Sequence, residues 1–261
     1  MSTPVLLQPS IDVGAPGGDS LTGSVHSWDI STGVDGPGTR FVTFLSGCPL
    51  RCLYCQNPDT WLRDNGTRMS VDDVLGEAAK FVPFIRASGG GATISGGEPL
   101  QQPKFATSLL QGFQGLGLST ALDTSGYLGR LASDELLAAT DLVLLDIKAG
   151  QPETYRRLTG RDLKPTLDFA IKLAKRGKRV WLRYVLVPGI TDAIEEIGAV
   201  AGFAGGLGNI ERVDVLPFHT LGQSKWEALN RRFVLADTPT PTSEQVEEAR
   251  DVFRAAGLTA Y

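Results

Sequence analysis

The sequence has few of the residues that place a chain in several large classes of protein. Its 261 residues include only three cysteines, so a disulfide framework is excluded and a reducing, cytoplasmic location is expected. It has no apolar run of about 18 residues, which argues against a membrane-spanning helix. The formal net charge is −4, so the chain lacks the positive excess that is typical of a nucleic-acid-binding face.

The first 20 residues also lack the features of a folded segment. They have neither the basic start nor the apolar stretch of a secretory signal, and they contain Pro4, Pro9, Gly14, Pro16, Gly17 and Gly18. We therefore expect residues 1–20 to be a disordered tail, to which we assign no function. Residues 21–261 are expected to form a single core domain, because their length and the 42% hydrophobic content suit one large globular unit.

What the sequence does contain is a compact group of thiols. Cys48, Cys52 and Cys55 fall within eight residues at the spacing C-x3-C-x2-C. A structural zinc site takes four protein ligands, and an iron–sulfur cluster normally takes four thiolates. Three thiolates would therefore leave one iron of a cluster with free coordination positions, as a catalytic centre requires.

These cysteines have two plainer interpretations. Their offsets also fit the buried stripe of a helix, but Gly47 and Pro49 interrupt a helical pattern. A zinc site would need a fourth Cys or His, and none lies between Cys55 and His219. The spacing therefore favours a metal centre over buried thiols.

From Arg40 onward, short β-type runs alternate with helical stretches. The predicted strands are Phe41–Ser46, Ala92–Ser95, Ser119–Asp123, Leu142–Asp146, Val180–Val187 and Arg212–Leu216. The predicted helices are Ser70–Ala87, Gln101–Leu116, Ser133–Ala139, Leu163–Arg176, Asp192–Gly205 and Thr242–Ala256, with Ser70 and Ser133 as candidate N-caps. This alternation predicts an α/β protein with a parallel sheet. Six repeats are too few for an eight-stranded barrel, so the pattern leaves a doubly wound sheet and an open barrel as alternatives.

Polar residues gather where the predicted strands end. Cys48, Gly96–Glu98, Asp123–Thr124, Asp146–Lys148 and His219 follow strands, and Arg183 lies inside an otherwise apolar strand. Ligands of parallel sheets bind at the carboxyl ends of the strands, so these groups are expected to share one mouth. Glu98 and Pro99 are expected to shape the turn, and His26 is expected to be structural. Trp61 and Tyr155 are given no role.

A series of motifs in fixed order identifies a family. These motifs are residues 34–41 (VDGPGTRF), the cysteine segment 47–61, and then residues 88–91 (SGGG), 95–99 (SGGEP), 122–126 (LDTSG), 145–148 (LDIK), 181–184 (WLRY) and 216–219 (LPFH). The set resembles the pyruvate formate-lyase activating enzymes of the radical S-adenosylmethionine (SAM) superfamily. The resemblance implies a partial (β/α)6 barrel of the TIM type, which decides between the two folds left open above.

The same resemblance implies a cofactor for each motif. Cys48, Cys52 and Cys55 would bind a [4Fe–4S] cluster, which acts with SAM. The residues implied to bind SAM are Tyr54, Cys55, Gln56, Gly97, Asp146, Ile147, Lys148, Arg183 and His219. Many family members have His where Gln56 stands, so at this position only the backbone contacts are expected to match theirs. A monovalent cation would bind oxygens of Asp123, Thr124 and Asp146 and the backbone carbonyl of Leu144.

The implied function is the activation of pyruvate formate-lyase. Reductive cleavage of SAM would yield a 5′-deoxyadenosyl radical, which removes a hydrogen atom from a specific glycine of that partner. The interval from Gln56 to Ser95 contains no cysteine, which favours the short pyruvate formate-lyase type over activases with an added cysteine-rich insert. The expected partners are pyruvate formate-lyase and flavodoxin or ferredoxin, with no nucleic acid and no membrane, and the chain is expected to be a monomer.

Two alternatives remain. One is a radical SAM enzyme that acts on another glycyl radical enzyme or on a small molecule. The other is an interaction protein that carries zinc or a cluster and does not cleave SAM.

Overall fold

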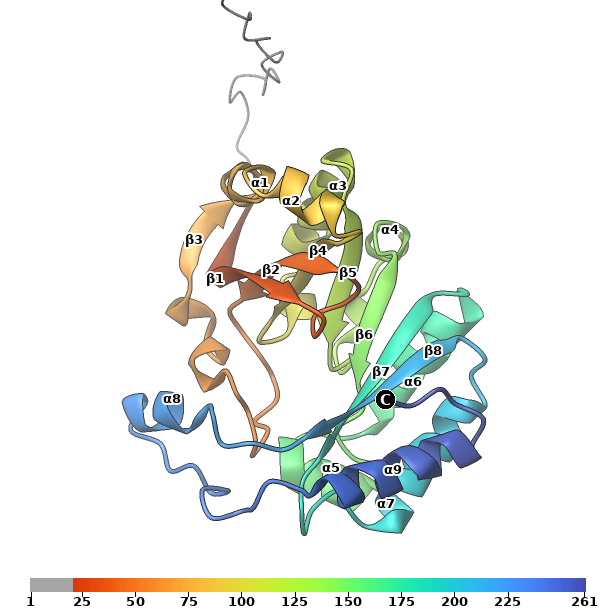
Figure 1. Ribbon diagram of the computed structural model, residues 1–261. Coiled ribbons are helices and arrows are strands. Elements are labelled where there is room, and N and C mark those ends of the chain that lie inside the picture. Colours follow the sequence, from red (N-terminus) through yellow and green to blue (C-terminus); the bar gives the residue numbers. More distant parts are fainter. Residues whose placement is uncertain (1–20) are drawn as a thin grey trace, which may run out of the picture.

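The computed structural model describes residues 21–261 (Figure 1). The tail predicted over residues 1–20 lies outside the described residues. No helix of the described part is both long enough and apolar enough to cross a membrane.

An open sheet of eight strands organises the fold, in the order β3-β1-β2-β4-β5-β6-β7-β8. Six adjacent strands of this sheet run parallel to one another: β2 (Thr39–Leu45), β4 (Gly91–Gly96), β5 (Ser119–Thr124), β6 (Leu142–Asp146), β7 (Arg179–Leu186) and β8 (Ile210–Pro217). The strands β1 (Thr22–Thr32) and β3 (Thr67–Ser70) continue the sheet in antiparallel pairs beyond β2. The parallel part confirms the predicted (β/α)6 arrangement, whereas sequence analysis missed β1 and β3.

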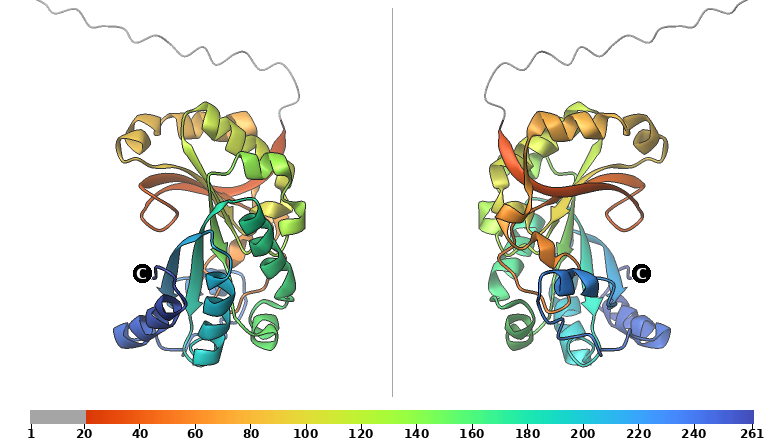
Figure 2. Two further views of the ribbon diagram at one scale, coloured as in Figure 1. Left: turned by 90° about the vertical axis from the view of Figure 1, so that its right-hand side faces the viewer. Right: turned by 90° about the vertical axis from the view of Figure 1, so that its left-hand side faces the viewer.

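Most helices cover the outer face of the curved sheet, and the two edges of the sheet do not meet (Figure 2). These helices are α1 (Val71–Ala79), α2 (Val82–Ala87), α3 (Pro103–Gly115), α4 (Asp134–Ala138), α5 (Pro152–Thr159), α6 (Lys164–Lys175), α7 (Ile194–Gly205) and α9 (Ser243–Ala255). The short α8 (Gln223–Ala228) lies apart from them, against residues Pro58–Thr60 (Figure 1). Helices on one face of a curved sheet exclude the doubly wound alternative.

The single helix predicted over Ser70–Ala87 is wrong, because the structure divides it into α1 and α2. Pro83 is the second residue of α2. A proline has no N–H to donate to the residue four positions earlier, and its ring crowds that carbonyl, so the preceding helix ends at Ala79. The predicted start is confirmed: Ser70 accepts a hydrogen bond from Asp73 N–H, and the Asp73 carboxylate accepts one in return, forming a capping box.

The core lies between the outer face of the sheet and these helices. In α3 the buried residues are Phe105, Ala106, Leu109, Leu110 and Phe113, the spacing of one helical face. The ring of Phe41 in β2 packs against the ring of Phe113, with 6.1 Å between the two ring centroids. Burying each such large side chain contributes about 1.5–3 kcal/mol, so this layer fixes the positions of the strands.

Strand register brings the candidate residues together. In the register of the sheet, Asp146 of β6 lies opposite Arg183 of β7, and Asp123 of β5 lies opposite Leu144 of β6. Because these strands are parallel, their carboxyl ends share one edge of the sheet. The polar residues that follow neighbouring strands therefore face a common space.

Candidate active site

A cavity of about 590 Å³ opens at this edge of the sheet. Among the predicted site residues, those that line it are Cys48, Cys52, Tyr54, Cys55, Gln56, Gly97, Asp123, Asp146, Lys148, Arg183 and His219. The structure thus brings together groups that are up to 171 positions apart, from Cys48 to His219. Thr124 and Ile147 are the two predicted residues whose side chains do not line it, and the Ile147 side chain is buried in the core.

The cysteines lie on the loop that follows β2. Backbone hydrogen bonds hold this loop: Cys48 N–H donates to Trp61 O at 3.0 Å, Arg51 N–H to Thr159 O at 2.8 Å, and Leu53 N–H to Leu158 O at 3.0 Å. None of the three cysteines forms a disulfide. The loop therefore presents three thiols to the cavity from a fixed backbone.

Burial makes these thiols poor acids on their own. It raises the pKa of Cys52 to about 12, and it also raises the pKa of Cys48 and of Cys55. A buried thiolate becomes stable when a metal neutralises it. Among the described residues, no three His, Cys, Asp or Glu side chains are grouped tightly enough to hold a single metal ion. In an iron–sulfur cluster each thiolate binds a different iron, and three separated thiols at one cavity wall fit that kind of group.

The two glycines after β4 bring a second loop against the cysteine loop. Gly96 has φ +121°, a conformation that L side chains rarely adopt. A Cβ atom on Gly97 would lie 2.4 Å from the carbonyl oxygen of Gly47. Glycine is therefore needed here for the close approach of two loops, in addition to leaving space in the cavity.

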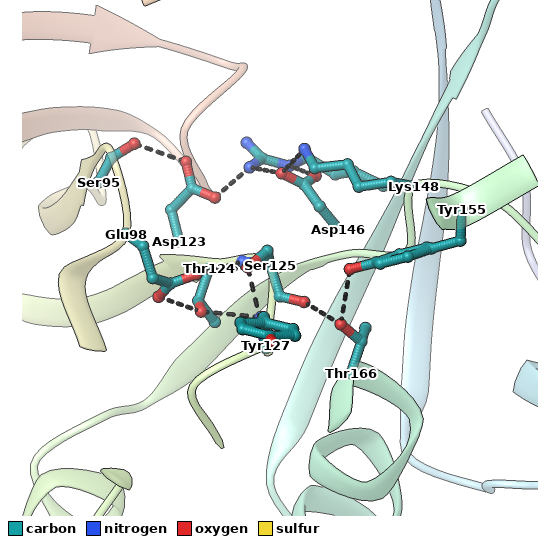
Figure 3. Close-up of polar contacts among 12 residues, drawn as sticks. Ser95, Glu98, Asp123, Thr124, Ser125, Tyr127, Asp146, Lys148, Tyr155 and Thr166 are labelled. Carbon is teal, nitrogen blue, oxygen red and sulfur yellow. Dashed lines mark hydrogen bonds and ion pairs between the residues drawn. The ribbon is translucent and has the colours of Figure 1, made fainter. Parts of the chain in front are cut away.

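Glu98 fastens this turn to the end of β5 (Figure 3). The side chain is 1% exposed. One carboxylate oxygen accepts from the Thr124 hydroxyl at 2.6 Å and from Leu100 N–H at 3.2 Å; the other accepts from Ser125 N–H at 3.0 Å and from the Ser125 hydroxyl at 2.5 Å. Burial raises the pKa of Glu98, and the donors from Ser125 and Thr124 oppose that rise. The predicted turn-shaping role of Glu98 agrees with these contacts.

The same bonds involve Thr124, at the end of β5. Its hydroxyl donates to Glu98 and accepts from Gly126 N–H at 2.9 Å. A contribution of Thr124 to a cation site stays a prediction. The sequence could not reveal the bond to Glu98, because Glu98 and Thr124 lie 26 positions apart.

Replacing Glu98 by glutamine is expected to lower the free energy of unfolding by about 1–3 kcal/mol. Glutamine offers one oxygen in place of two, and its NH2 group would face Ser125 N–H, which cannot act as an acceptor. Urea unfolding measures the loss, with the exposed Glu248→Gln as the control, for which a change within about 0.5 kcal/mol is expected. A loss no larger than that of the control would mean that Glu98 is a neutral acid in the native protein.

Four charged residues at the strand ends form what we call the ion network: Asp123, Asp146, Lys148 and Arg183 (Figure 3). Arg183 donates to Asp146 at 2.8 and 3.1 Å and also pairs with Asp123. Lys148 donates to Asp146 at 2.7 Å, and Ser95 donates to Asp123 at 2.6 Å. Two acids and two bases therefore balance each other at the cavity wall.

The two carboxylates of the ion network differ in pKa. Burial opposes the charge of both, but Arg183 and Lys148 together hold the pKa of Asp146 at about 2. Burial dominates at Asp123 and raises its pKa to about 6, although Arg183 acts in the opposite direction. Asp146 raises the pKa of Lys148 well above its usual value, against the effect of burial. Lys148 is therefore held at the cavity wall by its ion pair with Asp146.

Gln56 and His219 join the cysteine loop to the loop that follows β8. Gln56 donates from its side chain to Tyr54 O at 3.0 Å and to His219 O at 3.1 Å. Tyr54 is 5% exposed, its hydroxyl has no partner, and Lys148 Nζ lies 5.7 Å from its ring centroid. The Gln56 side chain is thus used within the protein, to connect loops 163 positions apart.

Sequence analysis missed several parts of the cavity wall. Val34 and Asp35 line it from the loop between β1 and β2, although their motif was noted without a role. Trp61 also lines it, and Trp226 of α8 packs edge-on against Trp61 at 5.0 Å and donates to Cys55 O at 2.9 Å. No local signal marks Trp226, because α8 is a helix of six residues in a segment without clear periodicity.

Known proteins resemble this chain over most of its length. The family model described as the radical SAM superfamily matches residues 42–201. The chain is 39% identical over 240 residues to the pyruvate formate-lyase 1-activating enzyme of Escherichia coli (strain K12), with 91% of this chain and 98% of that protein covered. It is 42% identical over 225 residues to the pyruvate formate-lyase-activating enzyme of Clostridium pasteurianum, with 86% and 94% covered.

Solved structures share the fold. A domain of a pyruvate formate-lyase-activating enzyme from Bacteroides vulgatus has a TM-score of 0.56 at 23% identity and covers 66% of this chain and 98% of its own. Streptococcus suis SuiB bound to its precursor peptide SuiA has a TM-score of 0.63 at 17% identity, with 87% of this chain and 48% of that chain covered.

Proposed function

The chain belongs to the radical SAM superfamily and, within it, to the pyruvate formate-lyase activating enzymes, and from this membership we propose how its site works. The enzyme activates pyruvate formate-lyase, and membership of the superfamily implies a [4Fe–4S] cluster and SAM as its cofactors. The observation that carries the proposal is that three free thiols, the glycine turn and the ion network line one cavity.

In this proposal Cys48, Cys52 and Cys55 hold the cluster. When bound, the cluster and SAM supply a reductive cleavage that yields a 5′-deoxyadenosyl radical, which abstracts a hydrogen atom from a glycine of the partner. The chain contributes a buried loop for the thiolates and cavity walls that exclude water from the reaction. Trp61 and Trp226 close the wall beside Cys55.

The ion network is proposed to orient the charged end of SAM. Gly97 leaves room for the amino group, and Arg183 and Lys148 provide donors for the carboxylate. Because Asp146 and Asp123 already hold both cations, little rearrangement is needed when the ligand binds. Tyr54, Cys55, Gln56 and His219 are proposed to surround the adenosyl part, and Ile147 can contribute only its backbone.

A monovalent cation beside SAM stays a prediction. Arg183 already places positive charge between the carboxylates of Asp123 and Asp146, and the Thr124 hydroxyl is engaged by Glu98. The oxygens of the two aspartates, of Thr124 and of the Leu144 carbonyl remain the candidate ligands. A flavodoxin or ferredoxin as the reductant, a monomeric state and a cytoplasmic location are proposed with the function.

The function is tested by an anaerobic reconstitution. The protein is loaded with iron and sulfide, reduced, mixed with SAM and purified pyruvate formate-lyase, and examined by EPR and by chromatography of 5′-deoxyadenosine. A glycyl radical doublet with a matching amount of 5′-deoxyadenosine is expected. Deoxyadenosine without the doublet would point to another radical substrate, and no cleavage by a reduced, loaded protein would overturn the proposal.

A further inference from the structure

Three arginines reach the cysteine loop from outside the cavity. Arg51 donates to the carbonyl oxygens of Cys48 at 2.7 Å and of Leu50 at 2.6 Å. Arg161, from the turn after α5, donates to the carbonyl oxygen of Pro49 at 2.9 Å. Arg51 and Arg161 are exposed, and neither lines the cavity.

The third arginine shares an aromatic ring with the first. The guanidinium carbon of Arg51 lies 5.0 Å from the ring centroid of Trp61, and that of Arg231 lies 5.5 Å from the same ring. Trp61 is 6% exposed and lies beside Cys55. Burial raises the pKa of the Cys55 thiol, and the Trp61 side chain offsets part of that rise. One indole therefore separates a thiol from two exposed cations.

The backbone places Arg231 there by a special turn. Asn230 has φ +52°, the one positive value for a non-glycine residue in the described part of the chain. Asparagine tolerates this left-handed conformation better than most residues. After the turn, Arg231 N–H donates to Trp226 O at 2.9 Å, so the side chain returns toward Trp61 instead of continuing away from α8.

The charges of these three arginines are not balanced by ion pairs with other described residues. Within the described residues, no carboxylate lies within 4.0 Å of the Arg51, Arg161 or Arg231 guanidinium. Among the other arginines of the described residues some are paired, such as Arg156 with Asp162, and others, such as Arg63, have no carboxylate within 4.0 Å, so it is the gathering of three unpaired arginines at one loop that marks this surface. A chain with a net charge of −4 thus gathers unpaired positive charge around its cysteine loop.

We propose that the surface formed by Arg51, Arg161 and Arg231, the arginine face, docks the reductant, a small electron-transfer protein with an acidic surface. This inference rests on the proposed function, in which the donor loses one electron and the cluster gains it. Complementary charge steers such encounters and fixes their orientation. The cavity stays free for SAM and the glycine of the partner, because none of the three arginines lines it.

The test compares two routes of reduction in the loaded protein. The variant Arg161→Glu with Arg231→Glu is used, and Arg51 is left unchanged because its side chain holds two loop carbonyls, one of them of the ligand Cys48, whereas Arg161 holds only that of Pro49. Stopped-flow absorbance follows electron transfer from a purified, fully reduced flavodoxin, without SAM or pyruvate formate-lyase. We expect the second-order rate to fall by about 10-fold or more at low ionic strength and to lose most of its salt dependence.

The control is Lys80→Glu with Lys175→Glu, which makes the same change in net charge at exposed residues that follow α1 and end α6. Its rate with flavodoxin is expected to stay within about twofold of the unchanged protein, since remote surface charges act weakly. Reduction by dithionite, followed by 5′-deoxyadenosine formation, is expected to be the same in all variants. That second route separates a docking defect from a failure of the proposed chemistry.

Equal flavodoxin rates in the arginine variant and in the lysine control would overturn the proposal. It would also be overturned if the arginine variant kept its flavodoxin rate but needed more pyruvate formate-lyase for half-maximal activation, since the face would then bind the substrate protein. If the glutamate variant lost its dithionite-driven activity as well, both routes of reduction would be measured again with Arg161→Gln and Arg231→Gln, and that result would decide whether the face docks flavodoxin. A loss confined to flavodoxin would support docking, and equal rates would overturn it.

Discussion

Replacing Cys52 by serine is expected to abolish both the binding of the cluster and the cleavage of SAM. The chain has only three cysteines, all on one loop, so no other thiol can take the place of the lost ligand. A serine oxygen is a harder and much less acidic donor than a thiolate, and iron–sulfur clusters are held by thiolates. Iron and sulfide content after anaerobic reconstitution and the yield of 5′-deoxyadenosine measure the two losses.

The protein without its cluster provides the control for folding. Cys52 is 8% exposed, and a serine hydroxyl at this buried position is expected to cost about 1–3 kcal/mol in the free energy of unfolding. Circular dichroism should therefore still show a folded chain. Retention of a cluster that cleaves SAM in the serine variant would contradict the assignment of Cys52 as a ligand.

Replacing Asp146 by asparagine is expected to destabilise the protein and to weaken SAM binding. Asp146 is the sole carboxylate bonded to Lys148 in the described structure, and it also accepts two hydrogen bonds from Arg183. Removing one partner of a buried ion pair leaves an uncompensated charge, at a cost of about 3–5 kcal/mol. With both cations less well fixed, SAM affinity should fall roughly tenfold or more, as for the loss of a charge-assisted hydrogen bond.

The measurements are chemical unfolding of the cluster-free protein and SAM binding to the loaded protein. Glu211→Gln is the matched control, because it removes one acid from an exposed pair with Arg179 on the neighbouring strands β7 and β8. An exposed pair contributes about 0–1 kcal/mol, so little change is expected there. Unchanged SAM affinity in the Asp146 variant, with the cluster in place, would exclude a role for the ion network in binding SAM.

Some features of the fold could be predicted from local sequence. The boundaries Leu142–Asp146 coincide with those of β6, and every other predicted strand overlaps a parallel strand of the sheet. Such runs are recognisable because nearly every residue of β2, β4 and β6 is buried, whereas β7 alternates buried and half-buried residues. Serines before acidic residues also marked the starts of α1 and α4.

Other elements carried no local signal. The strands β1 and β3 pair with each other and with β2, and many of their residues are exposed, so their apolar pattern is weak. Helix α8 has six residues and contributes one fully enclosed side chain, Trp226. Short edge elements depend on the neighbours that they contact, which propensity alone does not describe.

The sequence by itself determined the family and the chemistry of the centre, because three thiols at fixed spacing and a series of strand-end motifs are properties of the chain order. Only the tertiary structure decided which charged and polar groups meet. It pairs Arg183 with two aspartates, directs Thr124 to Glu98, and joins Arg51, Arg161 and Arg231 around one loop. The physical reason is that ion pairs and hydrogen bonds are selected by strand register and burial, and both arise from contacts between distant segments.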